Sequence, residues 1–321
     1  MQVYQAGKQV FEMTGVDLTK LERSIEALSD DITAILGASH PAVVPKQAML
    51  RFEDGQACKI VSKLLQFGEE LRRELHPQSP SDKDLKHLRA MSPASGCALV
   101  FKPTCLALLP SLLLWPASRR FPVLDLLRLA LLDPAVASAM IASGTEATSV
   151  VQLVIAHGLA SEAGDVNHMM ALRFCCNFVA SAPPSLLLAE GASIIALVLE
   201  AAAVAEVHAA ARDGTRLALA TYLLNVATLL SSHAAKCAEK TPVVCALQQF
   251  LTAAHSNVEV CFRAVLALGT LVHNDADTAA LCVALDLEQL LHPLRVAFDA
   301  SDKLRACAAE VIQLLERAQV A

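Results

Sequence analysis

The chain has 321 residues, of which 55% are hydrophobic and 18% are charged, and its formal net charge is −6. An acidic chain does not present the broad basic surface that nucleic-acid binding requires. Aromatic residues make up only 4% of the sequence, and leucine and alanine dominate the apolar stretches. This composition favours helices over sheets, so we expect an all-α fold.

The longest apolar runs do not have the character of membrane spans. The run 105–117 is interrupted by two prolines, and the run 186–207 carries three glutamates. The N-terminus lacks the basic and apolar regions of a secretory signal. Ten scattered cysteines without a zinc-type spacing fit a reducing compartment. We therefore expect a cytoplasmic protein without membrane insertion, with the nucleus as a second location.

In chain order, the first predicted elements are two helices joined by an extended linker. Apolar residues recur at helical spacing over 17–36, and two prolines make 40–45 an extended linker. A second helix is predicted over 55–75, followed by a polar loop over 76–84 in which Ser81 or Asp82 caps the next helix.

From about residue 100, similar apolar helices recur with a period of about 45 residues, which is typical of armadillo and HEAT solenoids. The more buried helices are predicted at 121–132, 170–180, 217–230, 261–272 and 303–315. More amphipathic helices are predicted between them at 184–203, 242–254 and 286–298. We predict a right-handed solenoid of about five to six repeats over 41–321, preceded by an unassigned helix and linker over 1–40.

One position in these repeats is recurrently basic. Arg128, Arg173 and Arg263 are each the single basic residue of an apolar helix, at spacings of 45 and 90 residues, and Arg305 follows. Thr221 takes the matching position in the repeat between Arg173 and Arg263. One position per repeat forms a line along a solenoid, so we expect a basic groove for an acidic peptide. The alternative is structural: Asp125, three residues before Arg128, can pair with it within the helix.

Asn177 and Asn225 occupy equivalent positions in two successive repeats. A side-chain amide can bond both the N–H and the C=O of an extended peptide, so both residues are candidate peptide-binding residues. Alternatively, each asparagine satisfies a neighbouring carbonyl group.

The sequence predicts a binding module rather than an enzyme. It contains no GxSxG, HExxH, Walker A or GxGxxG motif, and we expect no metal and no cofactor. Two alternatives remain. Cys175 and Cys176 beside the arginine line could support a thiol-dependent activity with a histidine, or the solenoid could be a structural or dimerising scaffold.

Five blocks of the sequence resemble the PUL domain in collinear order over about 43–319. They are VPKQAMLRFEDGQACKIVSKLLQF (44–67), WPASRRFPVLDLLRLAL (115–131), ALRFCCNFV (171–179), LALATYLLNVATLL (217–230) and CFRAVLALGTLV (261–272). The PUL domain is the C-terminal part of the phospholipase-activating protein and ubiquitin-fusion-degradation adaptor family.

The resemblance implies an armadillo-like adaptor whose basic groove binds the acidic C-terminal tail of the AAA ATPase valosin-containing protein. It thereby implies a role in ubiquitin-dependent protein turnover and ubiquitin homeostasis. Carried onto this sequence, the groove arginines are Arg128 and Arg263. Full family members also have a WD-repeat propeller and a ubiquitin-binding domain, and neither is visible in these residues. In some relatives the domain is attached to thioredoxin-like or thiol-peptidase modules, which keeps the thiol alternative open.

Overall fold

The computed structural model describes residues 2–5, 8–12, 48–91, 107–142, 145–188, 194–208, 212–233, 237–253, 257–297 and 302–320. Contacts divide the chain into two units, Met1–Val44 and Pro45–Ala321. The helix predicted over 17–36 and the linker predicted over 40–45 lie outside the described residues.

The first unit contains two short antiparallel strands, β1 (Gln2–Gln5) and β2 (Lys8–Glu12). The all-α prediction did not anticipate this hairpin. Val3 pairs with Phe11 and Tyr4 with Gln9, so the register shifts between the two pairs. Neither strand alternates polar and apolar residues, since Val3 is followed by Tyr4 and Val10 by Phe11, and the composition therefore did not mark them as strands.

The second unit forms helices and no strands in its described residues, as the composition predicted, and the non-helical residues 48–56 precede the first of these helices. Its longer helices are α2 (Ala57–Arg73), α3 (Asp82–Ala90), α6 (Ala117–Ala130), α7 (Pro134–Ala142), α8 (Thr145–Gly158), α9 (Asp165–Ser181), α11 (Ile194–His208), α12 (Asp213–Ser232), α13 (Cys237–Thr252), α14 (Val258–Val272), α15 (Ala276–Ala284), α16 (Leu287–Ala297) and α17 (Asp302–Val320). Three shorter elements are α5 (Leu109–Leu113), η1 (Ser161–Ala163) and α10 (Pro184–Leu187).

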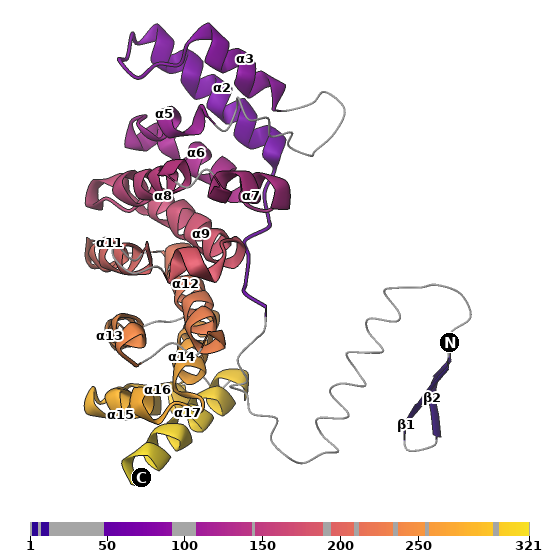
Figure 1. Ribbon diagram of the computed structural model, residues 1–321, viewed down its shortest axis with the longest axis vertical. Coiled ribbons are helices and arrows are strands. Elements are labelled where there is room, and N and C mark those ends of the chain that lie inside the picture. Colours follow the sequence, from indigo (N-terminus) through magenta and orange to yellow (C-terminus); the bar gives the residue numbers. More distant parts are fainter. Residues whose placement is uncertain are drawn as a thin grey trace. The chain divides into compact units, whose positions relative to one another are not determined.

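These helices form two stacked rows (Figure 1). In the inner row, α6, α9, α12, α14 and α17 pack successively against one another. In the outer row, α8, α11, α13 and α15 do the same. The five buried helices predicted from the repeat lie in the inner row. Its middle helix α12 contacts α9, α13 and α14, which explains why 14 of its residues are buried.

Several boundaries show local sequence effects. Ser81 caps α3 in a capping box with Asp84, which confirms the first of the two predicted caps. The single helix predicted over 184–203 is wrong, because α10 ends at Leu187 and α11 begins at Ile194. Leu188 already departs from helical geometry, with φ −103° and ψ 9°. Among the described residues, no helix has the length and apolar character needed to cross a bilayer.

A buried arginine joins the start of α6 to two neighbouring helices. Arg120 donates from Nε to the carbonyl of Leu113 (2.8 Å), from Nη2 to that of Trp115 (2.7 Å) and from Nη1 to that of His157 (2.5 Å). These carbonyls lie at or just beyond the C-terminal ends of α5 and α8, where helical C=O groups lack intrahelical partners and carry partial negative charge. Burial lowers the pKa of Arg120, and the three carbonyls offset part of the cost of burying its charge.

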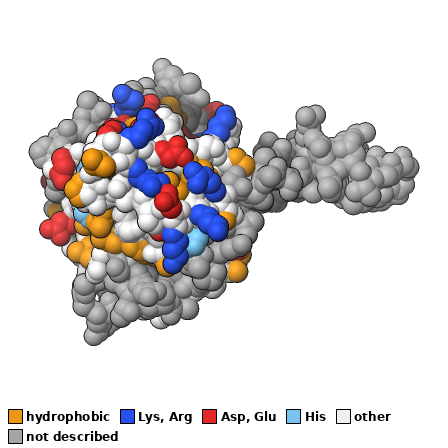
Figure 2. All heavy atoms as spheres, turned by 90° about the horizontal axis from the view of Figure 1, so that it is seen from above, with side chains coloured by type: hydrophobic (Ala, Val, Ile, Leu, Met, Phe, Trp, Pro, Cys, Tyr) orange, Lys and Arg blue, Asp and Glu red, His pale blue; other side chains and the backbone are white. Residues whose placement is uncertain are grey.

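The end of the solenoid formed by α2 and α3 has a mixed surface (Figure 2). Basic and acidic side chains alternate there, and ion pairs join Arg72 to Asp82 and Arg89 to Glu69. Such a surface is well solvated and does not present one sign of charge to a partner. The candidate binding surface lies elsewhere, along the inner row.

Candidate functional site

An extended segment of the chain lies along the inner row. Residues 48–54, here called the strap, run past α12, α9 and α6 before Gly55 and Gln56 lead into α2 (Figure 1). Leu50 is bonded to α12, Phe52 to α9 and Asp54 to α6. The strap therefore passes the repeats in the reverse of their sequence order.

Two asparagines hold the main chain of the strap. Asn225 accepts the N–H of Leu50 through Oδ1 (2.8 Å) and donates from Nδ2 to its carbonyl (2.7 Å). Asn177 makes the same pair of bonds to Phe52: its Oδ1 accepts the N–H of Phe52 (2.8 Å) and its Nδ2 donates to the carbonyl of Phe52 (3.0 Å). Alternate residues of an extended chain face the same side, so one asparagine per helix meets every second residue. This is the amide geometry predicted for a bound peptide, and here the chain's own residues adopt it.

The same two amides also connect neighbouring inner helices. Asn177 Nδ2 donates to the carbonyl of Arg128 on α6 (3.1 Å), and Asn225 Nδ2 to that of Cys176 on α9 (3.3 Å). Both asparagines are buried, with 0% and 1% exposure. The structural interpretation, in which each amide satisfies a neighbouring carbonyl, therefore also applies.

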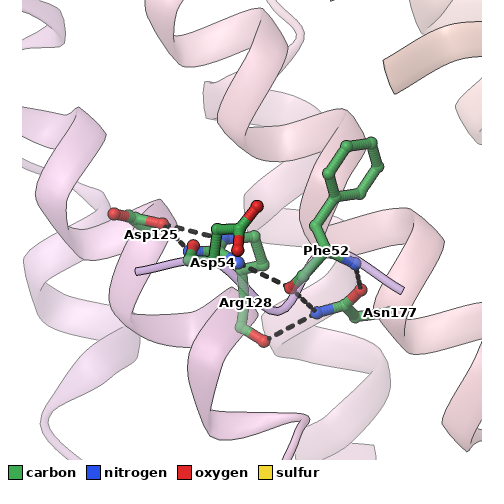
Figure 3. Close-up of polar contacts among 5 residues, drawn as sticks. All are labelled: Phe52, Asp54, Asp125, Arg128 and Asn177. Carbon is green, nitrogen blue, oxygen red and sulfur yellow. Dashed lines mark hydrogen bonds and ion pairs between the residues drawn. The ribbon is translucent and has the colours of Figure 1, made fainter. Parts of the chain in front are cut away.

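Arg128 fastens the end of the strap (Figure 3). Its Nη1 donates to the carbonyl of Phe52 (2.6 Å) and its Nη2 to that of Asp54 (2.7 Å). Asp125 accepts from Nε (2.8 Å) and Nη2 (2.6 Å), which is the pairing within the helix expected from its position three residues earlier. Arg128 is only 1% exposed. Its guanidinium group is therefore committed to contacts within the chain.

The close approach of the chain to Arg128 explains why residue 55 is a glycine. A Cβ atom on Gly55 would lie 2.9 Å from Arg128 Nη2 and 3.0 Å from the Leu129 methyl carbons. No larger residue fits there without displacing the guanidinium group or Leu129.

Arg173 lies beside the strap in a different environment. Its guanidinium carbon is 4.9 Å from the centre of the Phe52 ring, in a cation–π contact. Its Nε is buried and has no hydrogen-bond partner among the described residues. Burial lowers the pKa of Arg173, and the nearby charge of Arg128 lowers it further. Arg173 is thus a half-buried cation with at least one donor, Nε, that forms no hydrogen bond within the described part of the chain.

The line of repeat positions predicted from the sequence, here called the ladder, consists of Arg128, Arg173, Thr221, Arg263 and Arg305. Its next two positions after Arg173 are Thr221 and Arg263. Arg263 donates from Nη1 to Thr221 Oγ1 (2.6 Å) and from Nε to Glu259 (2.7 Å), and its side chain is 20% exposed. The register that aligned Thr221 with the arginines therefore places it next to Arg263. Arg305 on α17 pairs with Asp302, three residues earlier, and its side chain is 40% exposed. Among the described residues, no hydrogen bond or ion pair joins Arg305 to the other predicted site residues.

The strap was not predicted from the sequence as an occupant of the groove. Residues 48–54 lack helical periodicity, and this was the signal that could have identified them as an extended segment. Arg51 also belongs to the site, because its Nη2 donates to the carbonyl of Ala180 at the end of α9 (2.8 Å).

The two cysteines considered for thiol chemistry are buried in α9. Burial raises the pKa of Cys175 to about 12 and that of Cys176 well above its usual value. The charges of Arg263 and Arg173 oppose part of the rise in the pKa of Cys176 but do not outweigh burial. A reactive cysteine needs access and an accessible thiolate, and neither residue offers them. The described residues contain no cluster of three or more potential metal ligands.

Comparison with known proteins identifies the family. The PUL domain model matches residues 44–310. The chain is also 27% identical over 260 residues to the phospholipase A-2-activating protein of Xenopus laevis, an alignment that covers 77% of this chain and 30% of the relative. The chain thus spans less than a third of that protein's length. The match begins just before the strap and extends through the repeats to α17, and the chain accordingly belongs to the PUL domain family.

Proposed function

We propose that this chain is a non-catalytic adaptor module that binds the acidic C-terminal tail of the AAA ATPase valosin-containing protein. Membership of the PUL domain family supports a protein-interaction module. The specific partner rests on the resemblance described above. In this role the chain would serve ubiquitin-dependent protein turnover in the cytoplasm and nucleus.

The observation that carries the proposal is the combination of main-chain recognition and positive charge on one face. Asn177 and Asn225 hold the chain's own strap through its peptide groups, which supports an extended chain as the kind of segment that lies along the inner row. Arg173 on α9 stacks on Phe52 of the strap, and Arg263 on α14 donates to Thr221 on α12. In a chain of net charge −6, this face suits an extended acidic peptide.

The cysteines provide the strongest support for a non-catalytic role. The thiols nearest the arginines are fully enclosed in α9, and their pKa values are raised by burial. An enzyme using either thiol would first have to open the stacked inner row. A binding role requires no such rearrangement.

A titration with a fluorescently labelled peptide of the ATPase tail tests the proposal. We expect saturable binding that weakens as salt is raised, because exposed guanidinium–carboxylate contacts are screened by salt. Arg263→Ala should weaken binding by about tenfold, equivalent to about 1.4 kcal/mol.

Arg89→Ala is the matched control, because it removes an exposed arginine from α3 at the mixed-charge end. It should leave the affinity unchanged, and circular dichroism should confirm that both variants are folded. The absence of saturable binding by the unmodified chain would reject the proposed partner. Equal affinities for Arg263→Ala and the unmodified chain would reject the basic face as the binding site.

A further inference from the structure

The arginines of the ladder differ in how many hydrogen bonds and ion pairs their guanidinium groups form within the chain. Arg128 is paired with Asp125 and donates to two strap carbonyls. Arg263 is paired with Glu259 and Arg305 with Asp302. Among the described residues, no carboxylate forms an ion pair or a hydrogen bond with Arg173, and its α9 neighbours at positions 169 and 170 are methionines.

The surroundings of Arg173 make this lack of a partner costly. Its Nε is buried without a hydrogen bond, and burial and the charge of Arg128 lower its pKa by more than the nearby carboxylates of Asp125 and Asp54 raise it. An unsatisfied buried donor and a nearby like charge both destabilise the free protein. A carboxylate placed on Arg173 removes part of both penalties at once. The structure therefore favours a ligand anion at this position over any other arginine of the ladder.

The geometry points to Arg173, stacked on the Phe52 ring, as the residue that receives a side-chain carboxylate of an extended acidic peptide, while the strap stays in place as one wall of the site. This inference rests on the proposed function and deepens it. It assigns different roles to two ladder arginines: Arg128 fastens the strap, and Arg173 binds the partner.

Two features argue that the strap is retained. Its peptide groups are bonded to Asn225, Asn177 and Arg128, so a competitor would have to replace all of these bonds. It is also joined to α2 through only Gly55 and Gln56. A short tether gives an effective concentration on the order of millimolar, which a free peptide has to overcome.

The spacing of the ladder indicates side-chain carboxylates rather than a single chain terminus. Arg173 and Arg263 lie on two inner helices separated by α12, and Thr221 on α12 bonds to Arg263. An extended peptide crossing these helices meets more than one cation. Acidic side chains can recur along such a peptide, whereas a terminal carboxylate occurs once.

The main experiment measures the affinity of the full chain for the labelled ATPase tail peptide. Arg173→Gln should weaken binding at least tenfold, and Arg173→Lys should weaken it by a smaller factor, because lysine keeps the charge but not the planar stack on Phe52. Phe52→Leu retains the main-chain bonds of the strap and should weaken binding a few-fold. Arg212→Gln is the control, since Arg212 is an exposed arginine at the start of α12 and should bind as the unmodified chain does.

Modified peptides identify the source of the carboxylate. A peptide whose Asp and Glu residues are replaced by Asn and Gln should lose binding, and a peptide amidated at its C-terminus should retain it. The opposite pattern would overturn the assignment to side-chain carboxylates.

Hydrogen exchange of the Leu50 and Phe52 amides identifies the fate of the strap. We expect exchange at both amides to stay the same or to slow when the peptide binds. Faster exchange on binding would show that the peptide displaces the strap and would overturn the inference. Unchanged binding by Arg173→Gln, with its melting temperature preserved, would also overturn it, whereas no binding by the unmodified chain would reject the proposed function itself.

Discussion

The two ends of α6 each contain a buried arginine, and the two residues are satisfied in different ways. Arg120 donates to three carbonyls at or near helix ends, which the stacking of α5, α6 and α8 fixes. Arg128 donates to two carbonyls of the strap and to Asp125. One arginine stabilises the solenoid, and the other joins the solenoid to a tethered segment. A lone arginine in an apolar helix can therefore have either role, and only its partners distinguish the two.

The largest expected effect on the free energy of unfolding comes from replacing the two buried arginines of α6, one at a time. Arg120→Met leaves three carbonyls without their donor and should lower the free energy of unfolding by about 3 kcal/mol. Arg128→Met should have a smaller global effect, because the strap can open locally while the helices remain stacked.

Urea unfolding measures the global effect, and hydrogen exchange at Leu50 and Phe52 measures the local one. Arg128→Met should accelerate exchange in the strap, and Arg120→Met should not do so until the chain unfolds. Equal losses of global stability in the two variants would contradict the division between a structural and a fastening arginine.

A third buried cation, Lys240, differs from the two arginines of α6 because its ion pair should make stability depend on pH. Lys240 is paired with Asp275 at 2.6 Å. Burial acts to raise the pKa of Asp275, but hydrogen bonds from Lys240 and Thr278 outweigh it, and the pKa is lowered from its usual value of 3.8. Because the folded pKa lies below the unfolded one, this stabilisation is present above about pH 4 and is lost as the pH falls through the folded value.

Asp275→Asn should therefore reduce stability near pH 7 by about 1–3 kcal/mol and flatten its decline below pH 4. Arg120→Met should keep the acid dependence of the unmodified chain, because the carbonyl partners of Arg120 do not titrate. Urea titrations at pH 7 and pH 3 provide the comparison. An unchanged acid dependence in Asp275→Asn would exclude this ion pair as its source.

The smallest expected effect tests how closely the strap fits against Arg128. Gly55→Ala places a methyl group 2.9 Å from Arg128 Nη2 and should cost about 0.5–1 kcal/mol, with faster exchange at Phe52. Gly164→Ala is the matched control, because Gly164 has φ +82° and no atom within 4 Å of the added carbon. It should cost about 1–3 kcal/mol through backbone strain but leave exchange in the strap unchanged. Identical exchange in the two variants would show that the strap tolerates the methyl group.

The helical architecture could be predicted because it depends on short-range patterns. Apolar residues at helical spacing and a recurring period predicted the five inner helices. One of them is α12, which is buried between α9 and α14. The break between α10 and α11 was missed because the apolar composition continues across 184–203. The hairpin at the N-terminus was missed because its strands are short and its sequence does not contain a standard two-residue turn.

The residues on the ladder face could also be predicted, but not their partners. The repeat register placed Arg128, Arg173, Asn177 and Asn225 together, and it placed Thr221 beside Arg263. The residues that the two asparagines bond through both N–H and C=O lie within 48–54, where Phe52 is 125 positions from Asn177 and Leu50 is 175 positions from Asn225. The asparagines bind peptide groups rather than side chains, so the sequence of the strap contains almost no signature of its binding.

The shared hydrogen bonds of Asn177 and Asn225 have a mechanical consequence. Each Nδ2 bonds a strap carbonyl and a carbonyl of the preceding inner helix at the same time. The strap thereby acts as a brace across α6, α9 and α12, and resists bending of this half of the inner row. The row continues into α14 and α17, where neither asparagine reaches, so under load the two halves of one solenoid should differ in stiffness although their helices are alike.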